Sequence, residues 1–137
     1  AVSTGGTQIP FAIVERASGK AIGSTRYLDI RRGDRGLEIG WTWIGLPFQR
    51  TAVNTECKYL LLVHAFEDQR AVRVQLKTDL RNEASQRAIE RLGAVREGVL
   101  RKHMVLWDGF IRDTVYYSII DSEWPEVKRR LQRRLAR

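Results

Sequence analysis

The chain changes from a strand pattern to a helix pattern at Gln49-Arg50-Thr51-Ala52-Val53-Asn54. The first turn of a helix leaves backbone N–H groups without partners and carries the positive end of the helix dipole, so it favours an anion. Arg50 adds a full positive charge there. The segment predicts a phosphate-binding helix start. An ordinary capped helix, with Thr51 or Asn54 as the cap, explains the same residues.

A second helix start carries Asn82 and, three residues later, Ser85. Asn82 has the residue type of an N-cap, and Gly93 suits the position just after the helix end. Ser85 shares a helix face with Ala88 and Leu92. Its hydroxyl either bonds back to a main-chain carbonyl or serves a ligand, and the sequence leaves both interpretations open.

Other kinds of chemistry lack their usual motifs. The sequence contains no GxxxxGK[ST], GxGxxG or HExxH pattern. One cysteine, Cys57, and two histidines, His64 and His103, argue against a disulfide framework and against a metal site. A single cysteine is typical of a reducing compartment, so we expect a cytoplasmic protein. No apolar run approaches the ~20 residues of a membrane span, so we expect no membrane association.

Strand and helix patterns alternate along the chain in one order. They predict strands at 10–17, 21–30 and 37–44, a helix at 51–67, a strand at 71–79, a helix at 82–92, strands at 95–107 and 110–120, and a helix at 123–137. With 137 residues, the chain has the length of one domain, typically ~100–150 residues. We therefore expect a single α/β domain, residues 1–137, in the order β-β-β-α-β-α-β-β-α.

Local pairing adds finer expectations. Asp108-Gly109 predicts a two-residue hairpin loop, which pairs Trp107 with Phe110 and places His103 opposite Thr114. Met104 then lies opposite Asp113. Strand alternation places Trp41 and Trp43 on one face. His64 lies on the apolar face of the 51–67 helix, so we expect it in the core.

The formal net charge is +8, but it is uneven. Residues 126–137 hold Lys128, Arg129, Arg130, Arg133, Arg134, Arg137 and one acid, Glu126. The last helix also has a narrow apolar stripe of Val127, Leu131 and Leu135. We expect this helix to dock by its stripe with its arginines in solvent. It should bind polyanions weakly, with an affinity that falls as the salt concentration rises. We expect no specific nucleic acid as a partner.

Four motifs in order resemble the GNAT superfamily of N-acetyltransferases, over about residues 10–125. Leu37-Glu38-Ile39-Gly40-Trp41 is similar to the E-I-G-Y/W strand of its ribosomal-protein N-terminal acetyltransferase branch. Gln49 to Asn54 stand at the Q/R-x-x-G-x-G/A loop, with Ala52 and Asn54 in place of small glycines. Asn82-Glu83-Ala84-Ser85 matches N-x-x-S, and Leu92-Gly93-Ala94 with Glu97-Gly98 matches the segment that follows.

The resemblance implies a mixed, mostly antiparallel central sheet flanked by helices. It also implies acetyl-CoA as co-substrate, an amine acceptor (a protein N-terminus or a small amine) and direct attack on the thioester. The family opens with a strand and two helices, for which the residues before Pro10 are too few, so we expect this chain to lack them and its acceptor groove to be incomplete. The resemblance assigns the cofactor to Thr42, Trp43, Ile44, Gln49, Arg50, Thr51, Ala52, Val53, Asn54 and Asn82. It implies that the main chain of residues 42–44 binds the pantetheine arm and that the N–H groups of residues 50–54 bind the pyrophosphate.

The same resemblance assigns a catalytic role to Ser85, which would stabilise or protonate the leaving thiolate. The attacking amine must be neutral, so a base is expected. His103 is the first candidate and Glu38 the second. Two alternatives stay open: a module of the same fold that binds CoA without catalysis, and an RNA-associated module. The sequence also leaves a homodimer open.

Overall fold

The structure is a computed structural model, and it describes residues 8–136. The elements in chain order are β1 (Ile9–Val14), β2 (Ala21–Arg31), β3 (Gly36–Ile44), α1 (Ala52–Val63), β4 (Arg73–Asp79), α2 (Glu83–Arg91), β5 (Val95–Val105), β6 (Ile111–Ile120) and α3 (Trp124–Leu135). This order confirms the predicted mixed α/β arrangement. Within residues 8–136, no helix combines the length and apolar character needed to cross a bilayer.

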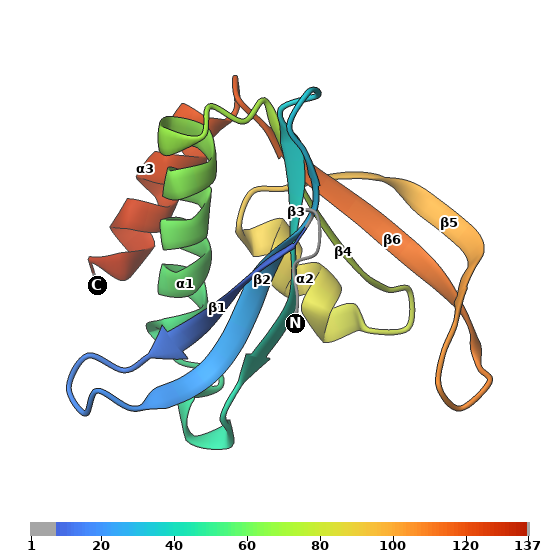
Figure 1. Ribbon diagram of the computed structural model, residues 1–137, viewed down its shortest axis with the longest axis horizontal. Coiled ribbons are helices and arrows are strands. Elements are labelled where there is room, and N and C mark those ends of the chain that lie inside the picture. The colour runs from blue at the N-terminus through green and yellow to red at the C-terminus, as the bar shows by residue number, and fades with distance from the viewer. Residues whose placement is uncertain (1–7, 137) are drawn as a thin grey trace.

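One six-stranded sheet runs through the molecule in the order β1-β2-β3-β4-β6-β5. Neighbouring strands are antiparallel, except for β3 and β4, which are parallel. That parallel pair is short: Gly36, Leu37 and Glu38 face Arg73, Val74 and Gln75, and the pairing ends there. Beyond this junction the two strands separate (Figure 1). The mostly antiparallel sheet is therefore open in its middle.

A bulge in β3 follows this junction. Gly40 lies opposite Arg26 and Trp43 opposite Ser24, so Trp41 and Thr42 together face one residue of β2. Trp41 adopts a positive φ of 50°, which is uncommon for a bulky residue. A bulge of this kind bends a strand and redirects its side chains. It accounts for the way β3 turns away from β4.

Helices α1 and α3 lie side by side (Figure 1) and share a core with the sheet. Tyr117, Leu62, Ile119, Val74 and Leu131 are among its fully buried side chains. Helix α1 is followed by a π-helical turn over His64–Asp68, so the predicted helix at 51–67 is two helical segments. His64 is not in the core, contrary to expectation: its side chain is 46% exposed and pairs with Asp68.

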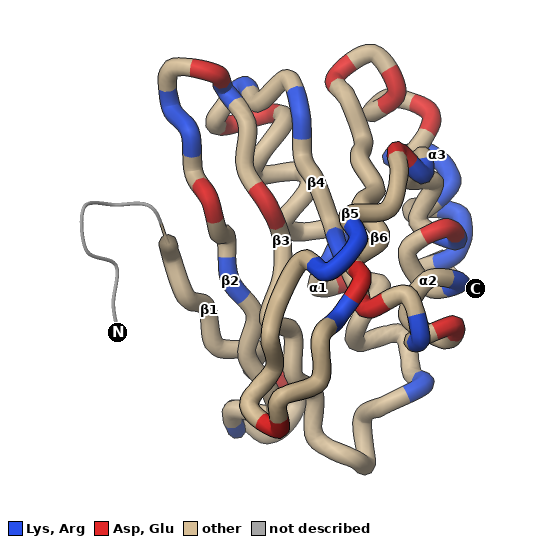
Figure 2. Tube along the Cα trace, turned by 90° about the vertical axis from the view of Figure 1, so that its right-hand side faces the viewer, with Lys and Arg blue, Asp and Glu red and all other residues tan. Residues whose placement is uncertain are grey.

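Helix α3 docks as predicted, by a narrow stripe. Val127 and Leu131 are buried and Leu135 is half-buried. Trp124 and Lys128 both donate to the carboxylate of Glu67. Exposed basic residues follow the rest of the helix, as Figure 2 shows by the Lys and Arg segments of α3.

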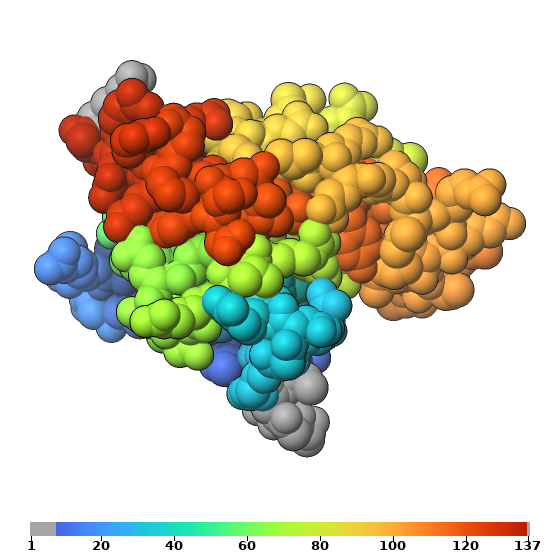
Figure 3. All heavy atoms as spheres, turned by 90° about the horizontal axis from the view of Figure 1, so that it is seen from above, coloured from blue at the N-terminus to red at the C-terminus, as the bar shows by residue number. Residues whose placement is uncertain are grey.

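The β5–β6 hairpin differs from its predicted register. Leu106 donates to the carbonyl of Phe110 at 2.9 Å, so the loop has three residues, Trp107, Asp108 and Gly109. Gly109 supplies the positive φ (+86°) that this loop requires. The pairing Trp107–Phe110 was therefore wrong. The hairpin extends away from the rest of the molecule (Figure 3).

A second irregularity shifts the same hairpin further along. Met104 faces Arg112, and not Asp113, and Leu100 faces Thr114. The extra residues between Leu100 and Met104 form a bulge in which Lys102 has a φ of 49°. The main-chain N–H of Lys102 donates to Asp113 Oδ1 at 2.8 Å. His103 is therefore not the cross-strand partner of Thr114 that the two-residue loop predicted.

Candidate functional site

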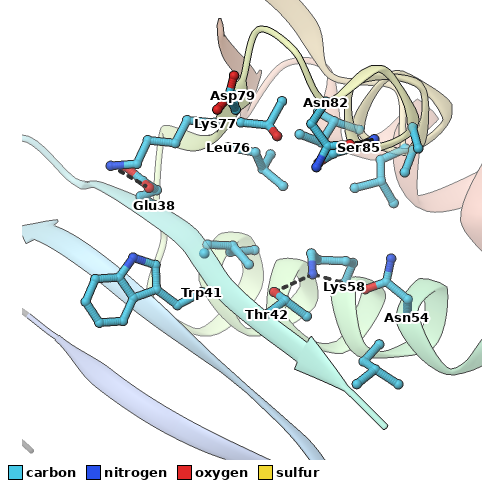
Figure 4. Close-up of a pocket in the computed structure, with 18 of the residues that line it drawn as sticks. Glu38, Trp41, Thr42, Asn54, Lys58, Leu76, Lys77, Asp79, Asn82 and Ser85 are labelled. Atoms are coloured by element: carbon cyan, nitrogen blue, oxygen red, sulfur yellow. Dashed lines mark hydrogen bonds and ion pairs between the residues drawn. The ribbon is translucent and has the colours of Figure 1, made fainter. Parts of the chain in front are cut away.

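A cleft of about 680 Å³ lies where β3 and β4 separate. One side, here the β3–α1 wall, consists of β3 beyond the junction, the loop to α1 and the first turns of α1. The other side, the β4–α2 wall, consists of the end of β4 and the start of α2. Figure 4 shows Thr42, Asn54 and Lys58 on the first wall and Asn82 and Ser85 on the second.

The structure brings most of the predicted site residues to this cleft. The lining includes Thr42, Ile44, Gln49, Arg50, Asn54, Asn82 and Ser85. The residues Trp43, Thr51, Ala52, Val53 and His103 are not among those that line the cleft. The main-chain contacts that the resemblance implies for Trp43, Thr51, Ala52 and Val53 stay a prediction.

The main chain of β3 offers an open edge in the cleft. Residues 43 and 44 pair with β2 on one side. The pairing with β4 ends at Glu38, so the described strands cover no more of that edge. An extended ligand with amide groups can add to such an edge as a further strand would. This edge includes Thr42, Trp43 and Ile44.

The loop before α1 is held by its own side chains. Gln49 donates from Nε2 to the carbonyl of Ile44 at 2.8 Å. Thr51 is the N-cap: its Oγ1 accepts the N–H of Val53 at 3.2 Å and donates to the carbonyl of Phe48 at 2.5 Å. Arg50 has a φ of 60° and is exposed. The cap prediction is thus confirmed at Thr51, and the first turn of α1 reaches the cleft at Asn54, which lines it together with Arg50.

Lys58 was missed by the sequence analysis. The residue is only 7% exposed, and its ammonium donates to Thr42 Oγ1 at 2.8 Å and to Asn54 Oδ1 at 3.2 Å. Burial lowers its pKa below the usual value for lysine. A signal was present, because Lys58 lies beside the apolar stripe of α1, three residues before the buried Leu61.

Glu38 occupies the junction itself. It is 2% exposed, and its Oε1 accepts Nε2 of Gln75 at 3.0 Å. Its Oε2 has no hydrogen bond among the described residues, and Lys77 Nζ lies 3.4 Å from it. A Cβ at position 40 would lie 2.8 Å from Leu28 Cδ1 and 3.4 Å from that oxygen, so only glycine fits here without a shift of its neighbours. A buried carboxylate with one oxygen that accepts no hydrogen bond suits proton transfer.

A polar chain continues behind Glu38 across the sheet. Gln75 accepts from Arg73 at 3.1 Å, and Arg73 makes two bonds of 2.7 Å to the carboxylate of Glu97. Ser118 also donates to Glu97 at 2.7 Å. The hydrogen bonds from Arg73 hold the pKa of Glu97 below its usual value. This chain fixes the amide of Gln75 and, through it, the orientation of Glu38.

The β4–α2 wall carries the predicted pair. Asn82 caps α2, because its Oδ1 accepts the N–H of Ser85 at 3.0 Å. The hydroxyl of Ser85 has no hydrogen bond within residues 8–136, so the bond back to the main chain that the sequence allowed is not formed. Both residues line the cleft. Ser85 therefore presents an uncommitted donor to it.

His103 lies outside this cleft, although the next residue, Met104, lines it. Its Nδ1 is 2.9 Å from Thr114 Oγ1, and its ring meets that of Tyr116 edge-on, with the centroids 5.8 Å apart. The bulge in β5 produces this contact despite the shifted register. The imidazole is half-buried and already bonded.

Comparisons with known proteins agree with this geometry. The family model of the acetyltransferase (GNAT) domain matches residues 3–95. Putative ribosomal N-acetyltransferase YdaF from Bacillus subtilis (strain 168) is 34% identical over 95 residues, which are 69% of this chain and 51% of that protein. This chain thus spans about half the length of that relative.

Two solved structures share the fold. A putative acetyltransferase from T. thermophilus is 50% identical with a TM-score of 0.86, over 93% of this chain and 66% of that one. A GCN5-related N-acetyltransferase from Brucella melitensis is 34% identical with a TM-score of 0.88, over 93% of this chain and 57% of that one. The family model covers more than half of the sequence. The chain therefore belongs to the GNAT family of acetyltransferases.

Proposed function

We propose that the protein is an acetyl-CoA-dependent N-acetyltransferase that transfers an acetyl group to an amine. The observation that carries the proposal is the cleft at the β3–β4 junction. It joins an open strand edge and a helix start, which suit the donor, to the buried carboxylate of Glu38. One oxygen of this carboxylate accepts no hydrogen bond within residues 8–136, which suits the reaction. The half-buried free thiol of Cys57 agrees with a cytoplasmic location as part of this proposal.

The β3–α1 wall fits the chemistry of the donor. Acetyl-CoA has a long arm with two amides, which matches the open edge at Thr42, Trp43 and Ile44. It also has a diphosphate, which matches the start of α1 and the charge of Arg50. Gln49 and Thr51 hold this loop in place before any ligand arrives. The residues from Arg50 to Asn54 thus remain our candidates for the diphosphate contacts, and Asn82 for the arm near the thiol.

The chemical step requires that one proton be removed from the acceptor nitrogen and that the negative charge developing on the sulfur be stabilised. The acceptor nitrogen forms a bond to the thioester carbonyl carbon, and the carbon–sulfur bond then breaks to release the thiolate of CoA. Glu38 accepts the proton that leaves the nitrogen, directly or through one water. The hydroxyl of Ser85 donates a hydrogen bond to the sulfur as negative charge develops there. This account balances the reaction without a further reactant.

Glu38 suits the role of base better than His103 does. Glu38 lines the cleft, and its Oε2 accepts no hydrogen bond within residues 8–136. The ring of His103 bonds Thr114 and does not line the cleft. The ammonium of Lys77 lies 3.4 Å from Oε2 of Glu38.

The acceptor is an amine of a protein N-terminus or of a small molecule. The relative from Bacillus subtilis carries a ribosomal N-acetyltransferase name, which places peptides with ribosomal-protein N-termini first among the substrates to test. Release of free thiol from acetyl-CoA, measured with such peptides and with small amines, tests the proposal. Turnover with an amine supports it. Binding of acetyl-CoA without turnover on any amine favours a non-catalytic module, and absence of binding contradicts both.

A further inference from the structure

Lys58 is a buried cation with no acidic partner among residues 8–136. Its two hydrogen bonds go to neutral oxygens, Thr42 Oγ1 and Asn54 Oδ1. An ammonium has three protons to donate, so one remains without an acceptor in the described chain. Taking a cation out of water without an opposite charge is unfavourable. The described residues therefore provide no negative group beside the Lys58 ammonium, and a ligand bound in the cleft can provide one.

The position of the ammonium indicates where that negative group lies. Helical side chains point back toward the N-terminus of their helix. Lys58 follows this rule, since it contacts Asn54 four residues earlier, in the first turn of α1. Its ammonium also lines the cleft (Figure 4). The charge of Lys58, a residue in the second turn, therefore lies beside Asn54 in the first turn.

We propose that Lys58 is a specificity-determining residue for the donor, and that its ammonium binds the diphosphate of CoA together with the start of α1. This inference rests on the proposed use of acetyl-CoA and adds a residue to it. Asn54 and Thr42 act as positioning residues, because they hold the ammonium in the cleft before the donor arrives. A donor without a diphosphate gains nothing from Lys58.

The test compares three probes by calorimetry: CoA, dephospho-CoA, which keeps the diphosphate and lacks the 3′-phosphate, and pantetheine, which lacks both. Lys58→Gln keeps a hydrogen-bonding side chain and removes the charge. It should weaken CoA and dephospho-CoA at least about tenfold, the size expected when one partner of a buried charge pair is lost. Pantetheine affinity should stay the same.

Lys58→Arg keeps the charge and should retain most of the affinity for CoA. Lys20→Gln, at an exposed residue of the β1–β2 turn, is the matched control. Thermal melting of each variant shows whether it folds, and if the glutamine variant does not, the arginine variant still gives the ratio of CoA to pantetheine affinity.

Each outcome decides the inference. Unchanged CoA affinity in folded Lys58→Gln overturns it, and so does an equal loss for CoA and pantetheine, which would place the ammonium on the arm. A loss for CoA alone, with dephospho-CoA unaffected, would place it on the 3′-phosphate and also overturn it. Failure of the wild-type protein to bind any probe contradicts the proposed function itself.

Discussion

The two walls of the cleft differ in how far their polar groups are already bonded. On the β3–α1 wall, Gln49, Thr51, Asn54 and Lys58 all hold hydrogen bonds to neighbouring parts of the same wall. On the β4–α2 wall, Ser85 presents a hydroxyl without a partner in the described residues. Glu38, at the junction between the walls, likewise has one oxygen that accepts no hydrogen bond in this part of the chain, with Lys77 Nζ 3.4 Å from it.

This difference separates binding from chemistry. A wall whose groups are fixed in advance can hold a ligand without losing further conformational entropy. Groups that act on charge developing in the transition state must be free to make their bond there. We therefore expect changes at the β3–α1 wall to alter donor affinity, and changes at Glu38 and Ser85 to alter turnover.

The largest effect is expected at the junction. Glu38→Gln keeps the shape of the side chain and its bond to Gln75 but removes the base. Turnover at neutral pH should fall by about 10²-fold or more, since general bases contribute roughly 10²–10⁴-fold. Acetyl-CoA affinity should be unchanged. Steady-state kinetics with calorimetry tests this, with exposed Glu56→Gln on α1 as control. Wild-type turnover in Glu38→Gln would contradict the assignment.

Ser85→Ala should have the next largest effect. Removing a donor to a developing anion costs about 10²–10³-fold in rate, and we expect less here because water can take its place. Affinity for acetyl-CoA should change little, because the bond strengthens only as the thiolate forms. Thiol-release kinetics measures the loss, and exposed Ser122→Ala is the control. A change in affinity at constant turnover would assign Ser85 to binding instead.

Arg50→Glu tests the opposite wall. Reversing a charge beside the helix start should weaken CoA binding several-fold, while turnover at saturating acetyl-CoA stays close to that of the wild type. Arg101→Glu, exposed on β5, makes the same charge change outside the cleft. Equal affinity for CoA in the two variants would place the phosphates elsewhere.

The smallest effect is expected for the chain of hydrogen bonds behind Glu38, which runs from Gln75 through Arg73 to Glu97. The pKa of Glu97 is lowered in the folded state by its bonds to Arg73, so its stabilisation exists above the usual pKa and is lost as the pH falls through the folded-state pKa. Glu97→Gln should lower the free energy of unfolding by about 1 kcal/mol or less at pH 7, because the pair is partly exposed. Denaturant unfolding as a function of pH should show the difference shrinking below about pH 4.

Local chemistry made the helix ends of the site predictable from sequence. Thr51 and Asn82 cap their helices by bonds to residues two and three positions away. Gly93 ends α2 with a φ of +100°. Such signals depend on neighbours in the chain, so the sequence contains them.

Features that depend on distant strands escaped prediction. Glu38 is buried because Gln75, 37 residues away, pairs with it across a parallel junction. The contact of the Lys58 ammonium with Thr42 depends on the packing of α1 against β3. The bulges at Trp41 and Lys102 shift the register of their strands in ways that alternation alone does not reveal. The sequence therefore predicted which residues reach the cleft better than which of them are held or left open.

Hydrogen–deuterium exchange of the whole chain with and without CoA tests the central claim most directly. If the donor lies along the open edge of β3 and over the start of α1, exchange should slow at residues 42–44 and 50–54. The tip of the β5–β6 hairpin, residues 105–110, should exchange as before. Protection confined to that hairpin or to α3, or no protection at saturating CoA, would contradict the account.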